Sequence, residues 1–166
     1  IVFNVDGGDI FAATAAAGYV SEARDFEAFM RLVQPGAVVV DVGANFGLYA
    51  LSAAFYAQPG GRVYAFEPAP GAFATLQRNI NANAFGQMFE YRAAVGAEAG
   101  QATFHIAQDV SFSSLHDTGR SPEAETINVD VVTLDEALAS VSDIDLLKID
   151  VEGAEAEVFR GAKALM

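Results

Sequence analysis

One stretch of the sequence decides the fold: Val38-Val39-Val40-Asp41-Val42-Gly43-Ala44-Asn45-Phe46-Gly47. It begins as a short, uninterrupted run of branched apolar residues, which is typical of a strand buried on both faces of a parallel sheet. It then turns through glycines into a helix expected over residues 48–55. Such a turn gathers free backbone N–H groups and the positive end of the helix dipole at one place. The stretch therefore predicts a binding site for the polar part of a nucleotide-like ligand.

Strands and helices alternate after this stretch. Residues 62–67 form a second predicted strand, Pro68-Ala69-Pro70 opens a helix, and residues 88–95 form a third strand. The order β-α-β-α-β is typical of the right-handed crossovers of a doubly wound sheet. The sequence therefore predicts an α/β fold with a mostly parallel sheet and helices on both faces.

The next part departs from this alternation. Residues 102–106 and 126–132 are expected to be strands on either side of a polar segment, which predicts a hairpin with a long tip. Thr133 and Glu136 have the spacing of a capping box, so a short helix is expected over residues 135–141.

The last part of the chain returns to strand and helix. Residues 145–150 are expected to form a further core strand, and a helix should follow from about Ala154. No later strand pattern precedes Met166. Because a doubly wound domain normally continues at this point, we expect a domain that is truncated at its C-terminal end.

The N-terminal part has its own pattern. Residues 1–11 predict two short strands around a turn. Ser21 is expected to be the N-cap of a helix that Pro35-Gly36 ends. Two interpretations stay open: these residues are a cover packed against the larger domain, or they gate a ligand site.

Composition excludes several classes of function. The chain has 166 residues, a hydrophobic fraction of 52% and a formal charge of −13. The acidic balance argues against a nucleic-acid partner, because phosphates are neutralised by clustered Lys and Arg. The absence of cysteine excludes disulfides, Cys-zinc sites and a Cys nucleophile. No apolar run reaches the roughly 20 residues of a membrane span. A cytoplasmic protein is expected, and the sequence does not indicate its oligomeric state.

The glycine spacing and two acids restrict the class of ligand that the turn could bind. Asp41, Gly43 and Gly47 form Asp-x-Gly-x-x-x-Gly, which is neither the Gly-x-Gly-x-x-Gly of dinucleotide enzymes nor a P-loop. Glu67 ends the next strand, where a carboxylate can accept hydrogen bonds from ribose hydroxyls. Asp41 and Glu67 together disfavour a pyrophosphate and favour a ligand with positive charge, such as S-adenosylmethionine. The alternative is that Asp41 caps the turn and Glu67 is merely solvated.

From about Val38 onward the chain resembles the FkbM family of S-adenosylmethionine-dependent methyltransferases. The matching pieces are Val39-Val40-Asp41-Val42-Gly43-Ala44-Asn45-Phe46-Gly47-Leu48-Tyr49, Phe66-Glu67-Pro68-Ala69-Pro70, Ala93-Ala94-Val95-Gly96, Ser113-Ser114-Leu115, Val132-Thr133-Leu134-Asp135-Glu136 and Leu146-Leu147-Lys148-Ile149-Asp150-Val151-Glu152-Gly153-Ala154-Glu155. The resemblance implies a Rossmann-like, class I methyltransferase fold. Together with the N-terminal pattern, this predicts a hairpin and cover helix over residues 1–36 and an incomplete cofactor-binding domain over residues 37–166, in one structural domain.

The resemblance also implies cofactor contacts. Glu67 would hold the ribose, Pro68 would shape the turn beside the adenine, and Ala94 would lie near the adenine ring. Asp150 would face the methyl group and the substrate. The residues that would line the methionine end of the cofactor are Asp41, Gly43, Ala44, Asn45 and Gly47.

Three residues near the expected mouth are candidates for catalysis. Methyl transfer is a displacement at carbon, so the protein aligns the nucleophile and removes a proton where the nucleophile is a hydroxyl. Asp150 is the first candidate, followed by Lys148 and Glu152. Lys148 could instead form an ion pair with a neighbouring carboxylate, and Glu152 could be an acid favoured by a helix dipole. No set of metal ligands is evident.

The leading hypothesis is transfer of a methyl group from S-adenosylmethionine to a hydroxyl of a small molecule or sugar. The oxygen acceptor is implied by the resemblance alone. A second hypothesis is a binding or interaction module that keeps the cofactor pocket without catalysis. A nicotinamide oxidoreductase is a third, which the glycine spacing disfavours.

Overall fold

The computed structural model describes residues 1, 3, 20–107, 115 and 123–166. The hairpin predicted over residues 1–11 and the loop serines Ser113 and Ser114 lie outside the described residues, apart from Ile1 and Phe3.

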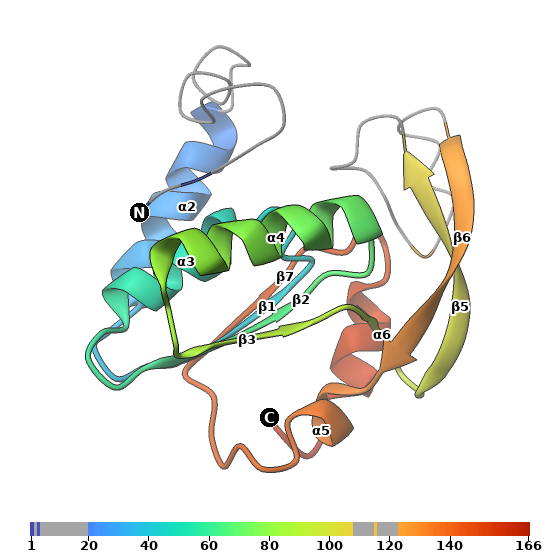
Figure 1. The fold of residues 1–166 in the computed structure, drawn as a ribbon. Helices are drawn as coiled ribbons and strands as arrows, with labels where there is room; N and C mark the ends of the chain where they lie inside the picture. The colour runs from blue at the N-terminus through green and yellow to red at the C-terminus, as the bar shows by residue number, and fades with distance from the viewer. Residues whose placement is uncertain (2, 4–19, 108–114, 116–122) are drawn as a thin grey trace.

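A parallel sheet forms the centre of the described chain (Figure 1). Its strands, in spatial order, are β3 (Met88–Tyr91), β2 (Arg62–Phe66), β1 (Val38–Val42) and β7 (Leu146–Ile149). Each neighbouring pair is parallel, with Asp41 beside Ala65 of β2 on one side and Lys148 of β7 on the other. The opening stretch is therefore a central strand, as its branched apolar residues predict.

Helices cover both faces of this sheet, which confirms the predicted doubly wound α/β architecture (Figure 1). One face carries α3 (Leu48–Tyr56) and α4 (Pro70–Asn83), with α2 (Val20–Leu32) packed beside α3. The other face carries α5 (Leu134–Ala137) and α6 (Glu155–Arg160).

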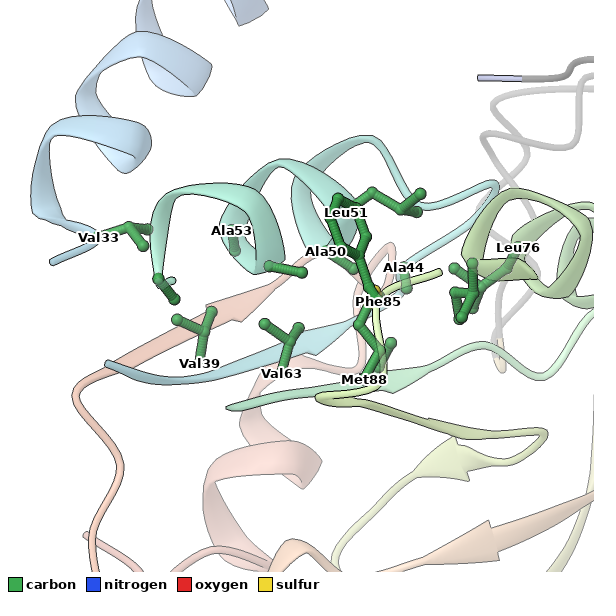
Figure 2. Packing of buried hydrophobic residues seen from close by; sticks show 14 of the residues in the cluster. Val33, Val39, Ala44, Ala50, Leu51, Ala53, Val63, Leu76, Phe85 and Met88 are labelled. Carbon is green, nitrogen blue, oxygen red and sulfur yellow. The ribbon is translucent and has the colours of Figure 1, made fainter. Parts of the chain in front are cut away.

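Alternate residues of the central strands pack on opposite faces, as strand geometry requires. Val39 and Val63 belong to the buried cluster beneath Leu51 and Leu76 (Figure 2). The cluster on the other face contains Leu134 and Val158 together with the strand residues Val40, Val42, Tyr64 and Phe66.

No helix in the described ranges is long and apolar enough to cross a bilayer.

A second sheet lies beside the first and contains β4 (Ala94–Val95), β6 (Glu123–Val132) and β5 (Gly100–Ala107) in that order. The β5 and β6 strands are antiparallel, which confirms the predicted hairpin.

The prediction of one continuous strand over residues 88–95 was wrong. The pairing with β2 ends where Tyr91 lies beside Phe66, and β4 pairs with β6 instead. Beyond Phe66 the neighbouring chain turns away at Pro68, which has no N–H to offer a ladder. Residues 92–95 therefore have no partner in the first sheet, and Ala94 and Val95 are buried against β6.

Two predicted helix starts can be checked. The Thr133 hydroxyl accepts a hydrogen bond from the Glu136 N–H at 3.2 Å, so the capping interaction is present, although α5 ends earlier than predicted. Helix α2 begins at Val20, so Ser21 lies in its first turn and is not the N-cap.

Candidate active site

The turn after β1 is too tight for side chains at its two glycines. Gly43 has φ +80° and Gly47 has φ +99°, a region that L residues rarely adopt. A Cβ at Gly43 would overlap the backbone oxygen of Asp150, and one at Gly47 would overlap the Leu51 side chain. The glycines therefore let the turn close against both β7 and α3.

The N–H groups of Gly43, Ala44, Asn45 and Gly47 are already paired within the chain, contrary to the expectation that the N–H groups of this turn are free. The N–H groups of Gly43 and Ala44 both donate to the Phe66 carbonyl at 3.0 Å, and the Gly47 N–H donates to the Ala44 carbonyl at 2.8 Å. The Asn45 N–H donates to a Glu67 carboxylate oxygen at 2.8 Å. The acceptors Phe66 and Glu67 lie within reach of the turn because β2 ends directly beside it. These four N–H groups are therefore not available to a phosphate.

Glu67 joins two turns at this edge of the sheet. It is 6% exposed. Its Oε2 accepts from the Asn45 N–H and its Oε1 from the Ala69 N–H, each at 2.8 Å. Burial, opposed by these two hydrogen bonds and reinforced by nearby Asp41, raises the pKa of Glu67 to about 7. The alternative of a merely solvated Glu67 is wrong, and each of its oxygens keeps a further lone pair for a ligand.

Asp41 and Lys148 form a buried ion pair across β1 and β7. The two residues are register partners, which places both side chains on the same face. Lys148 Nζ donates to Asp41 Oδ1 at 3.0 Å and to the Gly43 carbonyl at 3.3 Å, and lies 3.7 Å from Asp150 Oδ2. Burial lowers the pKa of Lys148, but the carboxylates of Asp41 and Asp150 outweigh it, so the pKa is raised overall. Lys148 is therefore a fixed cation.

One oxygen of this pair has no partner. Asp41 is 0% exposed, and its Oδ2 accepts no hydrogen bond from any part of the chain that the structure describes. A buried carboxylate oxygen without a donor is unfavourable, and such an atom in a native protein calls for an explanation. The alternative that Asp41 caps the turn is not what the geometry shows, because within the described residues the hydrogen bond to its carboxylate comes from Lys148.

Asp150 and Glu152 follow β7 at the same edge. The Asp150 N–H donates to the Val42 carbonyl at 2.9 Å, while its side chain is 64% exposed. Glu152 is half-buried and has φ +50°. Asp150 is thus a carboxylate open to solvent beside the turn.

Pro68 follows Glu67 directly, and Ala94 lies in β4 of the second sheet. Ala69, next to Pro68, and Ala94 belong to one apolar cluster with Ala72 of α4. Ala94 is buried and paired with β6. The second sheet therefore adjoins the turn that follows Glu67.

No role is predicted for Tyr49 from the sequence, although it lies two residues after Gly47. Its ring centroid is 4.8 Å from Lys148 Nζ. Only the three-dimensional arrangement shows this contact, because 99 residues separate the two positions along the chain.

Among the described residues no group of His, Cys, Asp and Glu could hold a metal ion.

Comparison with known proteins identifies the family. The model of the methyltransferase FkbM domain matches residues 41–166. The chain belongs to this FkbM family. One relative is the 31-O-demethyl-FK506 methyltransferase FkbM of Streptomyces tacrolimicus, with 32% identity over 79% of this chain and 61% of the relative. Another is the 2-O-methyltransferase NoeI of Sinorhizobium fredii, with 28% identity over 80% of this chain and 60% of the relative.

A solved structure supports the same fold. Methyltransferase FkbM of Methylobacillus flagellatus matches with a TM-score of 0.54 and 19% identity, over 77% of this chain and 29% of that one. This FkbM-family chain thus has the Rossmann-like architecture of class I methyltransferases. It spans about 60% of the length of the curated relatives named above.

Proposed function

We propose that this chain forms the cofactor-binding part of an S-adenosylmethionine-dependent methyltransferase. The observation that carries the proposal is that two buried acids lie beside a turn in which the N–H groups of Gly43, Ala44 and Asn45 are occupied. Asp41 Oδ2 and the remaining lone pairs of Glu67 are acceptors, whereas the N–H groups of Gly43, Ala44 and Asn45 already have partners. S-adenosylmethionine offers an ammonium and a ribose diol as donors and has no phosphate, so it fits this set of acceptors.

The proposed contacts follow the order of these groups along the sheet edge. Glu67 accepts hydrogen bonds from the ribose, and Pro68 and Ala94 border the adenine. The methionine end lies against the turn, with Asp41 Oδ2 accepting from the ammonium. The turn residues in this contact are Asp41, Gly43, Ala44, Asn45 and Gly47.

The cofactor, when bound, supplies an activated methyl group whose leaving group is a neutral thioether. The chain provides position and a proton acceptor. Asp150 is proposed to accept the proton of the nucleophile, because its carboxylate is exposed beside the turn. Lys148 fixes Asp41 and lies close to Asp150, so a positioning role suits its contacts better than proton removal. Glu152 stays a candidate for a contact with the substrate.

The proposed acceptor is a hydroxyl of a small molecule or sugar. The two curated relatives named above carry an oxygen position in their names, 31-O and 2-O. The acidic charge of −13 also disfavours a polyanionic acceptor.

Calorimetry tests the cofactor. We expect S-adenosylmethionine and its demethylated product to bind, and a nicotinamide dinucleotide not to bind. Tight nicotinamide binding without S-adenosylmethionine binding would refute the proposal. Transfer of a labelled methyl group to a panel of polyhydroxyl compounds then separates an enzyme from a binding module: binding without transfer to any acceptor favours the module.

A further inference from the structure

Tyr49 contacts both the covering helix and the buried ion pair. Its ring packs against Phe26 and Phe29 of α2, with centroid distances of 5.2 Å in both pairs and interplanar angles of 72° and 81°. These edge-on arrangements are favourable for aromatic rings. The same ring lies 4.8 Å from Lys148 Nζ, within the range of a cation–π contact. One side chain of α3 therefore links α2 to the end of β7.

The Lys148 ammonium has little freedom. It is shared between Asp41 Oδ1, the Gly43 carbonyl and the nearby Asp150 carboxylate, and its side chain is 14% exposed. The Tyr49 ring is a further favourable neighbour of the charge. Together these groups keep the ammonium at Oδ1 and leave Oδ2 without a donor.

The position of Lys148 therefore affects whether Asp41 Oδ2 is available to a ligand and how much positive charge lies near it. An ammonium released from the ring could move between both oxygens of Asp41 and compete with a ligand donor for Oδ2. It would also carry its positive charge closer to a cationic ligand, which weakens binding in a low-dielectric site. A ring that holds Lys148 in place favours a ligand that brings its own ammonium.

We propose that Tyr49 is a positioning residue that couples the placement of α2 to the Lys148 ammonium and so sets the affinity of the turn for a cationic, sulfonium-type cofactor. The inference rests on the proposed function for the identity of the ligand, but the coupling itself is a property of the free protein. The contacts of Tyr49 with α2 are a physical route by which the N-terminal part could gate the ligand site.

The binding test compares three substitutions on one helix. Tyr49→Leu removes the ring, Tyr49→Phe keeps the ring without the hydroxyl, and Tyr56→Leu changes an exposed tyrosine at the far end of α3. We expect the dissociation constant for S-adenosylmethionine, measured by calorimetry, to rise about three- to tenfold in Tyr49→Leu. Tyr56→Leu should bind like the parent chain, and Tyr49→Phe should keep the part of the affinity that depends on the ring. Equal affinity in Tyr49→Leu and the parent would overturn the inference.

A double-substitution cycle asks whether Tyr49 acts through Lys148. In a Lys148→Met background the ring has no cation to hold, so Tyr49→Leu should change the dissociation constant less than twofold. An undiminished effect in that background would show that Tyr49 acts by another route. Thermal unfolding of each variant separates a loss of fold from a loss of coupling.

A spectroscopic test needs no cofactor. The sequence contains two lysines, Lys148 and Lys163, so selective lysine labelling gives few signals, and Lys148→Met assigns one of them. The ring should shift the Lys148 Cε protons upfield in the parent and in Tyr49→Phe but not in Tyr49→Leu. Phe29→Leu should reduce the shift if α2 holds the ring. An absent shift refutes the coupling, whereas a present shift without S-adenosylmethionine binding refutes only the proposed function.

Discussion

The Glu67 carboxylate accepts a hydrogen bond from the Asn45 N–H at 2.8 Å, across 22 residues of sequence. This bond joins the end of β2 to the turn after β1, and the second oxygen holds the Ala69 N–H on the other side. Glu67 therefore has a structural role as well as its proposed role as the ribose acceptor. The two roles can be separated by experiment.

Glu67→Gln is expected to weaken both folding and cofactor binding. A glutamine places an NH₂ group against one of two backbone donors, so one buried N–H loses its acceptor, at about 1–3 kcal/mol of unfolding free energy. The dissociation constant for S-adenosylmethionine should rise at least tenfold, because one ribose acceptor is lost. Urea denaturation and calorimetry measure the two effects. Glu98→Gln, at an exposed position, is the matched control and should change neither.

The stability of the protein should depend on pH through Glu67. Its pKa is raised from 4.5 to about 7 by burial, so the folded state binds the proton more tightly than the unfolded state. The contribution of this group to stability is therefore fully present below pH 4.5 and is lost as the pH rises through 7. Between pH 5 and 8 the unfolding free energy should therefore fall more steeply with rising pH in the parent than in Glu67→Gln. Parallel curves would contradict the prediction.

Cofactor affinity should show the opposite trend. The ionised carboxylate is the better acceptor for a ribose diol, so binding of S-adenosylmethionine should strengthen as the pH rises towards 7, by up to about tenfold per pH unit. The dependence should level off above the pKa of Glu67. Calorimetry over the same pH range checks this, and Glu67→Gln should remove the dependence. A dependence that persists in the variant would point to another group.

Much of this site was predictable because parallel strands end at one edge. The apolar runs before Asp41 and before Glu67 identify two buried strands, and their parallel pairing brings both acids together. The pairing of Asp41 with Lys148 follows from the same geometry and was foreseen as an alternative. These relationships depend on strand period and order, which the sequence carries.

Other features depend on contacts that no local pattern reports. The occupied N–H groups of Gly43 and Ala44 follow from where the Phe66 carbonyl ends up. The split of residues 88–95 between two sheets depends on the turn of the neighbouring chain at Pro68. The contact between Tyr49 and Lys148 is a tertiary one. The proposed roles of Asp150 and Glu152 stay predictions.

Lys148→Met is expected to destabilise the protein strongly. It leaves the Asp41 carboxylate buried without its partner, and breaking a buried pair in this way costs about 3–5 kcal/mol. Lys163→Met removes the exposed lysine and should change the unfolding free energy by less than about 0.5 kcal/mol. The double variant Asp41→Asn with Lys148→Met should recover part of the loss, because no uncompensated charge remains. Urea denaturation of the four proteins checks the order.

Gly43→Ala tests whether the close approach of β1 and β7 matters beyond backbone conformation. Gly36 and Gly43 have similar φ angles, +86° and +80°, but a Cβ at Gly36 has no atom within 4 Å, whereas one at Gly43 overlaps the Asp150 carbonyl. Gly36→Ala should therefore cost only the left-handed strain, about 1–2 kcal/mol. Gly43→Ala adds an overlap with backbone that cannot rotate away, for a total of about 3–5 kcal/mol. It should also displace Asp150 and weaken S-adenosylmethionine binding at temperatures where the variant is folded. Equal losses of unfolding free energy in the two variants would mean that strain alone explains the glycine, and that the spacing of Gly43 and Asp150 is not what the site requires.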